Sequence, residues 1–393
     1  MIDYNKALSP QIQQMKPSGI RRFFDIAQQL EGVISLGVGE PDFKTPWAVR
    51  REAINVLEKG RTNYTANAGL IELRREIAAY FKRTINVDYD PEDEIIVTVG
   101  GSEGIDLAIR TIVSPGDEVL IVEPCFVCYK PIVSLCGGVP VPIETKAENN
   151  FRLTAEELRE KITDKTKLLV LPFPNNPTGA IMEKKDLEAV AEVLRGTNIL
   201  VLSDEIYSEL TYSGSHVSIA SLEGMRERTV VMNGFSKSFA MTGWRLGMAA
   251  GPREILKQML KLHQYAIMSS PTVSQFAAVT ALRSCEKDII KMRDEYDMRR
   301  RYLVDAFNKL GLDCFTPQGA FYVFPCIKST GLTSEEFCER LVNSKRVAVV
   351  PGDAFGDCGE GFVRVSYAYS LSHLREAVKR IGEFLEELKN GTV

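Results

Sequence analysis

Short runs of residues that are hydrophobic at nearly every position recur through the middle of the chain. They occupy residues 95–99, 119–122, 139–143, 168–171, 199–202, 229–232 and 246–250. Continuous apolar runs of this length are typical of strands covered on both faces. Helical patterns, among them 103–112, 184–194 and 254–267, lie between the runs. We therefore expect an α/β fold with a mostly parallel seven-stranded sheet, helices on both of its faces, and a site at the carboxyl ends of the strands.

The pattern changes on both sides of this central region. A long charged amphipathic helix is predicted at 286–310, followed by short apolar segments and a terminal helix at 372–388. The first forty residues are polar and irregular apart from a short helical pattern at 20–30. A chain of 393 residues also exceeds what one ordinary core needs. We predict an N-terminal arm that forms part of a small domain (1–45), a large cofactor-binding domain (46–284) and a C-terminal α+β small domain (285–393).

The charge and the hydropathy of the chain argue against nucleic acid and membranes as partners. The formal net charge is −4, with no basic tract of the kind that binds nucleic acid. No apolar run approaches the roughly 20 residues that a membrane-spanning helix needs, and the N-terminus lacks the layout of a signal peptide. We expect a cytoplasmic protein that binds neither nucleic acid nor membrane.

The eight cysteines include one formal CxxC pair, Cys125 and Cys128. A zinc site needs four ligands, and neither a second such pair nor paired histidines accompany it. We predict no metal site and interpret these cysteines as small buried apolar residues.

Lys237 is the first candidate for chemistry. It follows the apolar run 229–232 in what we predict to be a strand-to-loop turn, between Phe235 and Phe239. Apolar surroundings disfavour the ammonium form and make the nucleophilic amine easier to reach. A Schiff base with a carbonyl, most commonly that of pyridoxal phosphate (PLP), is the natural use of such an amine. Arg245 could then hold the cofactor phosphate; the alternative interpretation is a structural loop lysine.

Further polar residues follow other predicted strands. The glycine-rich turn with Gly101, Ser102 and Glu103 opens a helix, whose N-terminus can bind phosphate, although a full dinucleotide fingerprint is missing. Asn176, in a Pro- and Gly-rich turn, could donate to a phenolate oxygen, or could simply form an Asx turn. Asp204 could pair with a pyridinium nitrogen, and Tyr207, three residues on, could face the same ring. A helix-capping aspartate and a core-edge tyrosine are the alternatives.

Arg364 lies inside the apolar run 362–366. A buried guanidinium needs a partner, and its fork matches a carboxylate with two parallel hydrogen bonds. A substrate carboxylate and an internal salt bridge to a distant acid are both open interpretations.

These motifs, in this order, resemble the class I/II aminotransferases, which are PLP enzymes of fold type I. The likeness covers essentially the whole chain and is carried by residues 36–43 (LGVGEPDF), 64–69 (YTANAG), 115–119 (PGDEV), 175–179 (NNPTG), 203–207 (SDEIY), 233–247 and 362–367 (FVRVSY). Within the family the chain looks most like the prokaryotic aspartate, aromatic and N-acetyl-diaminopimelate aminotransferases. One departure is Gly234, where many relatives have a phosphate-binding serine; Ser236 or Ser238 could compensate.

The resemblance implies a role for each matching residue. Lys237 would bind PLP covalently and then carry a proton between Cα and C4′. The other cofactor contacts would come from Gly101, Ser102, Glu103, Phe126, Asn176, Asp204, Tyr207, Ser236 and Arg245, with Tyr64 supplied by the neighbouring subunit of a homodimer. Substrate would be bound by Ile20, Gly39, Asn176 and Arg364.

The implied activity is ping-pong transfer of an amino group between an L-amino acid and a 2-oxo acid. A PLP-dependent Cβ–S lyase on the same fold is the alternative enzyme, since it begins with the same Cα deprotonation. A PLP-binding transcriptional regulator is disfavoured, because it would need a basic DNA-binding domain.

Overall fold

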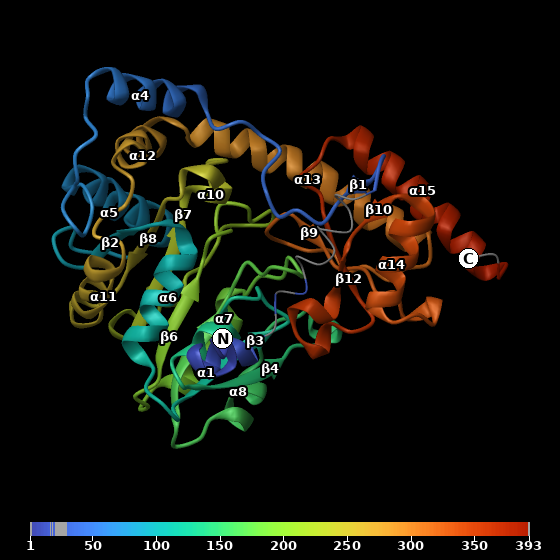
Figure 1. Ribbon diagram of the computed structural model, residues 1–393, viewed down its shortest axis with the longest axis horizontal. Coiled ribbons are helices and arrows are strands. Elements are labelled where there is room, and N and C mark those ends of the chain that lie inside the picture. Colours follow the sequence, from blue (N-terminus) through green and yellow to red (C-terminus); the bar gives the residue numbers. More distant parts are fainter. Residues whose placement is uncertain (1, 16, 18, 20–29, 392–393) are drawn as a thin grey trace.

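The computed structural model describes residues 2–15, 17, 19 and 30–391. A seven-stranded sheet forms its centre, with strand order β2-β8-β7-β6-β5-β3-β4 (Figure 1). The strands are β2 (Ile95–Thr98), β3 (Glu118–Glu123), β4 (Val139–Glu144), β5 (Thr166–Leu171), β6 (Leu200–Asp204), β7 (Thr229–Gly234) and β8 (Gly247–Ala250). Strand β8 runs opposite to the other six, so its pairings with β2 and β7 are antiparallel and the remaining pairings are parallel. The predicted mostly parallel α/β sheet is confirmed.

Alternate residues of the central strands enter different cores, which explains why the strands are apolar throughout. Val231 packs into a cluster with residues of α4 (Trp47–Glu58), α5 (Ile71–Ile85) and α12 (Thr272–Ser284). Its neighbours Val230 and Met232 join the opposite cluster, to which α6 (Gly100–Ile112), α7 (Tyr129–Leu135) and α11 (Arg253–Ala266) contribute. Residues of α8 (Ala155–Lys161) and α9 (Lys184–Leu194) belong to a third cluster. Both faces of the sheet are therefore buried.

A smaller α+β unit follows the long helix α13 (Glu286–Lys309), which leads away from the large sheet (Figure 1). It contains a three-stranded sheet of β9 (Tyr322–Val323), β11 (Val350–Pro351) and β12 (Val363–Ser366), with helices α14 (Ser334–Lys345) and α15 (Leu371–Lys389). Strand β1 (Ile34–Ser35) pairs in parallel with β10 (Val347–Ala348). This pairing supports the prediction that residues before 46 form part of the small domain, whose boundaries stay a prediction.

Several local predictions differ from the structure. Lys237 lies in the one-turn helix α10 (Phe235–Ser238), not in a loop. Helices α7, α8 and α12 were not predicted; α7 and α8 are only seven residues long, and most side chains of α12 are buried, so its pattern is weakly amphipathic. Residues 20–29 of the predicted 20–30 helix lie outside the described residues.

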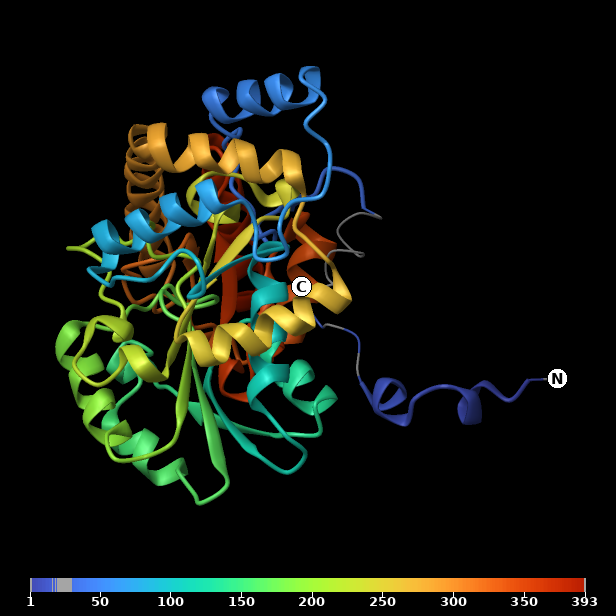
Figure 2. The same cartoon turned by 90° about the vertical axis from the view of Figure 1, so that its left-hand side faces the viewer.

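The N-terminal segment projects from the rest of the molecule (Figure 2). It forms two short helices, α1 (Tyr4–Ala7) and α2 (Pro10–Gln14), and neither contains a buried residue. Across the part of the chain that the structure describes, no helix combines the length and the apolar character needed to cross a bilayer.

Candidate active site

A cavity of about 380 Å³ lies where loops of the large sheet meet the small domain. Strand β6 ends at Asp204, β7 leads directly into α10 with Lys237, and β12 contributes Arg364. The predicted site residues that line the cavity are Gly39, Gly101, Ser102, Phe126, Asn176, Asp204, Tyr207, Ser236, Lys237, Arg245 and Arg364. Residues separated by more than 300 positions thus share one site.

Lys237 is held at the centre of this cavity. Its Nζ donates a hydrogen bond to the Gly39 carbonyl oxygen at 2.6 Å and lies 5.9 Å from the ring centre of Tyr207. Burial lowers the pKa of Lys237 to about 8, opposed by the negative charge of Glu40 and reinforced by the positive charge of Arg364. A lysine with this pKa has an appreciable fraction of neutral amine at mildly alkaline pH, which an ordinary surface lysine lacks.

Asp204 is a buried carboxylate, 8% exposed, whose partners are neutral groups. The Tyr129 hydroxyl donates to Oδ2 at 2.7 Å and the Ile206 N–H donates to Oδ1 at 3.2 Å. Burial raises the pKa of Asp204, and the bond from Tyr129 opposes that rise. The carboxylate can still gain from a cationic ligand. Tyr129 was not identified from the sequence, because a tyrosine near an apolar run usually packs in the hydrophobic core.

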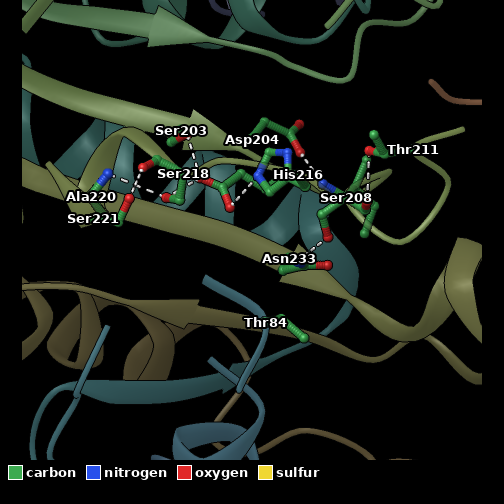
Figure 3. A network of polar contacts seen from close by, with 12 residues as sticks. Thr84, Ser203, Asp204, Ser208, Thr211, His216, Ser218, Ala220, Ser221 and Asn233 are labelled. Carbon is green, nitrogen blue, oxygen red and sulfur yellow. Dashed lines mark hydrogen bonds and ion pairs between the residues drawn. The ribbon is translucent and has the colours of Figure 1, made fainter. Parts of the chain in front are cut away.

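A polar network fixes the chain just after Asp204 (Figure 3). The buried Glu205 carboxylate accepts hydrogen bonds from the hydroxyls of Ser203, at 2.8 Å, and Ser218, at 2.5 Å. Its other oxygen lies 2.8 Å from Nε2 of His216.

The same network reaches the strand that leads to Lys237. The Asn233 side chain donates to the Ser208 hydroxyl at 3.0 Å and accepts from the Gly234 N–H at 2.8 Å (Figure 3). The segment that follows Asp204 and the end of β7 that leads to Lys237 are therefore held together by side chains that sequence motifs alone did not identify.

The glycine-rich turn and Arg245 form one end of the cavity. Arg245 has a φ of 51° and donates from Nη1 to the Thr242 carbonyl oxygen at 3.0 Å. Gly100 has a φ of 76°, and a Cβ there would lie 2.7 Å from Nη2 of Arg245. The positive φ is what favours glycine here, because the Arg245 side chain could move away from an added Cβ. The N-terminus of α6, which begins at Gly100, opens on the same end and offers unpaired N–H groups.

The Gly234 departure has a packing reason. A Cβ at Gly234 would lie 3.0 Å from Cδ1 of Ile206 and 3.2 Å from Cα of Gly247, which leaves little room for a side chain. Of the two serines that could compensate, Ser236 lines the cavity. Ser238 is not among the lining residues, and its hydroxyl is buried without a partner.

Two predicted residues in the described part of the chain, Glu103 and Tyr64, are not among those lining the cavity. The Glu103 carboxylate accepts from the Val99 N–H and lies 2.6 Å from Nδ1 of the buried His263. Only its backbone therefore stays a candidate for phosphate binding. Tyr64 is 81% exposed, and Ile20 lies outside the described residues.

Arg364 forms the opposite end and is only 3% exposed. Its Nη1 donates to Oδ1 of Asn176 at 2.8 Å, and its Nη2 donates to the Gly37 carbonyl oxygen. The guanidinium lies between two rings, 4.5 Å from the ring centre of Tyr322 and 4.8 Å from that of Phe355. Its Nε is buried without a hydrogen-bond partner. A buried guanidinium with neutral partners and an unsatisfied donor is suited to an anionic ligand.

The turn that carries Asn176 is held by its neighbour Asn175. The Asn175 amide donates to the carbonyl oxygens of Pro124 and Pro172, and its oxygen accepts from the N–H and hydroxyl of Thr178. Because Asn176 accepts from Arg364 through Oδ1, its amide NH₂ is the group left to donate to a ligand.

Comparison with known proteins agrees with this geometry. The profile of the family Aminotransferase class I and II matches residues 31–381. The chain belongs to this family. A putative aminotransferase, YugH, of Bacillus subtilis is 52% identical, with 97% of this chain and 98% of the relative covered.

Other relatives of this aminotransferase are named for different amino acids. An aspartate aminotransferase of Pyrococcus abyssi is 47% identical, with 98% of this chain and 99% of the relative covered. The crystal structure of an aromatic aminotransferase from Pyrococcus horikoshii is 45% identical and superposes with a TM-score of 0.90, covering 94% of this chain and 99% of the other. The protein is a PLP-dependent aminotransferase of fold type I, with amino acids and 2-oxo acids as substrates.

The residues of the cavity have the chemistry that PLP requires. Lys237 offers an amine for the aldehyde, and Asp204 offers an acid for the ring nitrogen. Asn176 and Tyr207 offer donors for the phenolate oxygen. Arg245 and the N-terminus of α6 suit a phosphate. The Arg364 guanidinium, which lines the same cavity, suits a carboxylate.

Proposed function

We propose that this cavity catalyses transamination with Lys237 as both the cofactor-binding amine and the proton carrier. Bound PLP supplies the electron sink that lets the Cα–H bond of an amino donor break. Lys237 would hold the cofactor through its amine and, once the amino donor is bound, would act as the base that carries the proton between Cα and C4′. The observation that carries the proposal is a buried amine with a pKa of about 8 in one cavity with the Asp204 carboxylate and the Arg364 guanidinium.

The other residues orient the cofactor in this proposal. Asp204, held by Tyr129, keeps the ring nitrogen protonated, while Asn176 and Tyr207 donate to the phenolate oxygen. The Phe126 ring, which lines the cavity, would contact the cofactor ring. The phosphate contacts come from Arg245, Ser102, Ser236 and the backbone of Gly101 and Glu103.

Arg364 binds the α-carboxylate of the substrate, with help from Asn176 and the backbone of Gly39. Two parallel hydrogen bonds to a carboxylate fix its orientation as well as its position. The names of the relatives reported above support an aspartate or aromatic amino donor. An N-acetyl-diaminopimelate donor stays a prediction from the resemblance. Ile20 as a contact to the substrate side chain, and the cytoplasm as the location, stay predictions.

We also propose a homodimer, in which Tyr64 reaches the phosphate of the neighbouring subunit. Supporting it, large apolar side chains are exposed on α4, in the segment after it and at the end of α11: Trp47 is 58% exposed, Leu57 56%, Tyr64 81% and Tyr265 90%. Apolar surface of this kind is typical of an interface. Mixing a Tyr64→Phe chain with an inactive Lys237→Ala chain tests the sharing of sites, because only mixed dimers can then contain an intact site.

The direct experiment on activity uses visible absorbance. The purified protein with PLP is mixed in turn with L-aspartate, L-glutamate, L-phenylalanine and L-tyrosine. We expect the yellow absorbance to bleach with at least one of them and to return on addition of a 2-oxo acid. A protein that gains no visible absorbance with PLP would contradict the proposal.

The same mixtures distinguish the alternative enzyme. Transamination leaves pyridoxamine phosphate after the half-reaction, whereas Cβ–S cleavage regenerates PLP and releases a thiol. Detection of thiol from L-cystathionine without pyridoxamine phosphate from any donor would favour the lyase.

A further inference from the structure

Tyr322 connects Tyr207 with Arg364, although its sequence context is that of a core residue. It lies on β9 of the small domain, is 1% exposed, and its side chain lines the cavity. Its hydroxyl is 2.9 Å from the hydroxyl of Tyr207, and its ring centre is 4.5 Å from the guanidinium carbon of Arg364. A Cβ added to Gly39 would lie 2.1 Å from the Tyr322 hydroxyl oxygen. Glycine at 39 is what leaves room for this tyrosine.

The direction of the hydrogen bond between the two tyrosines follows from the role proposed for Tyr207. Burial raises the pKa of both phenols, so each keeps its single proton near neutral pH. If Tyr207 donates this proton to the phenolate oxygen of PLP, its own oxygen must accept from Tyr322. Hydrogen bonds in a chain polarise one another, so a hydroxyl that accepts becomes a stronger donor.

The ring of Tyr322 has a separate contact. Together with Phe355 it encloses the planar guanidinium of Arg364, which is a favourable arrangement for a cation between aromatic faces. Since Nε has no hydrogen-bond partner, the rings and the bonds from the two Nη atoms are what hold the fork in place.

We propose that Tyr322 is a positioning residue with two separable actions on the site proposed above. Its hydroxyl strengthens the donation by Tyr207 to the cofactor, and its ring holds the Arg364 fork in position for the substrate carboxylate. The small domain therefore acts on both the cofactor and the substrate through one side chain.

Two substitutions separate these actions. Tyr322→Phe removes the hydroxyl and keeps the ring, whereas Tyr322→Leu removes both. A hydroxyl that donates to the phenolate oxygen competes with the proton held beside that oxygen, so a weaker donation raises the pH at which bound PLP changes its visible absorbance. For Tyr322→Phe we expect this midpoint to rise by about 0.3 to 0.5 pH unit. The KM is measured for whichever of L-aspartate, L-glutamate and L-phenylalanine is turned over. It should stay within about twofold of the wild-type value in Tyr322→Phe and rise about tenfold in Tyr322→Leu.

A matched control is Tyr212→Phe. Tyr212 donates its hydroxyl to the Ala320 carbonyl oxygen and is not among the residues that line the cavity, so its loss should leave the midpoint unchanged. In a Tyr207→Phe background, Tyr322→Phe should cause no further shift.

Three results would overturn the proposal. These are an unchanged midpoint in Tyr322→Phe, an equal shift in the Tyr207→Phe background, or an unchanged KM in Tyr322→Leu. A wild-type protein that gains no visible absorbance with PLP would instead overturn the proposed function, and the role of Tyr322 with it.

Discussion

The two arginines that line the cavity are held in opposite ways. Arg245 is exposed, and the structure gives its side chain one hydrogen bond, to the Thr242 carbonyl oxygen. Arg364 is 3% exposed, bonded to Asn176 and Gly37, and enclosed by two aromatic rings. One cation is hydrated and adjustable, and the other is desolvated and preformed.

This difference matches the two kinds of ligand that an aminotransferase holds. A resident phosphate is bound by many groups, including the N-terminus of α6, so one exposed cation adds only part of its binding free energy. A substrate carboxylate arrives and leaves in every cycle, and a preformed fork loses little freedom when it binds. The buried arginine should therefore contribute more per residue than the exposed one.

The largest expected effect is that of Lys237→Ala, which leaves both arginines in place. Loss of the amine removes the covalent link and the proton carrier together, so turnover should fall by roughly 10³-fold or more. Steady-state transamination measures the loss, and circular dichroism with thermal unfolding shows whether the variant is folded. Appreciable transamination by a folded Lys237→Ala protein would remove Lys237 from the mechanism.

Arg364→Lys should come next, since it keeps the charge and loses the fork. We expect the KM for the amino donor to rise about 100-fold, because a bidentate pair to a carboxylate is lost. The Kd for PLP should change little, because Arg364 is proposed to bind substrate only. Both constants should be measured on the same preparation. An unchanged KM would exclude Arg364 from substrate binding.

Arg245→Gln should weaken PLP binding and leave substrate binding unchanged, and the effect should be smaller than that of Arg364→Lys. The Kd for PLP should rise about tenfold, since one charge-assisted contact to the phosphate is replaced by a neutral one. At saturating PLP the KM for the amino donor should equal that of the wild type. If this variant instead changed KM and left the Kd for PLP unaltered, the assignment of the two ends of the cavity would be reversed.

The pH dependence of PLP capture by the apoprotein is the smallest of these effects. Neutral amine is the reactive form, so the rate should increase with pH through the pKa of Lys237, which is about 8. This predicts a rise of about fivefold between pH 7 and pH 8, a further rise of about twofold above pH 8, and then a plateau. The charge of Arg245 lowers this pKa, so the midpoint should move to higher pH in Arg245→Gln. Stopped-flow absorbance measures the rates, and a midpoint near 10.5 would mean that Lys237 is an ordinary lysine.

The sequence predicted the sheet well because most residues of its inner strands are buried on both faces. The apolar run 168–171, for example, falls inside β5, and 229–232 falls inside β7. Motif residues that follow such strands meet at one edge, which is why Asn176, Asp204 and Lys237 share a cavity.

Residues that act through other residues were not predictable in this way. Tyr129 and Tyr322 lie near or within apolar segments, where a tyrosine usually fills the core. Their hydroxyls become informative only when Asp204 and Tyr207 are seen at 2.7 Å and 2.9 Å. The role of Glu205 likewise depends on a hydrogen bond from Ser218, which lies 13 positions away in the sequence. Such pairs depend on tertiary distances, which no local pattern contains.

The most direct test of the central role of Lys237 is chemical. The protein is loaded with PLP, reduced with borohydride so that any Schiff base becomes a stable secondary amine, digested, and analysed by mass spectrometry. We predict one stoichiometric phosphopyridoxyl group, located on Lys237, and none in the Lys237→Ala variant. Label on a different lysine, or no label at all, would contradict the account of this cavity as the active site.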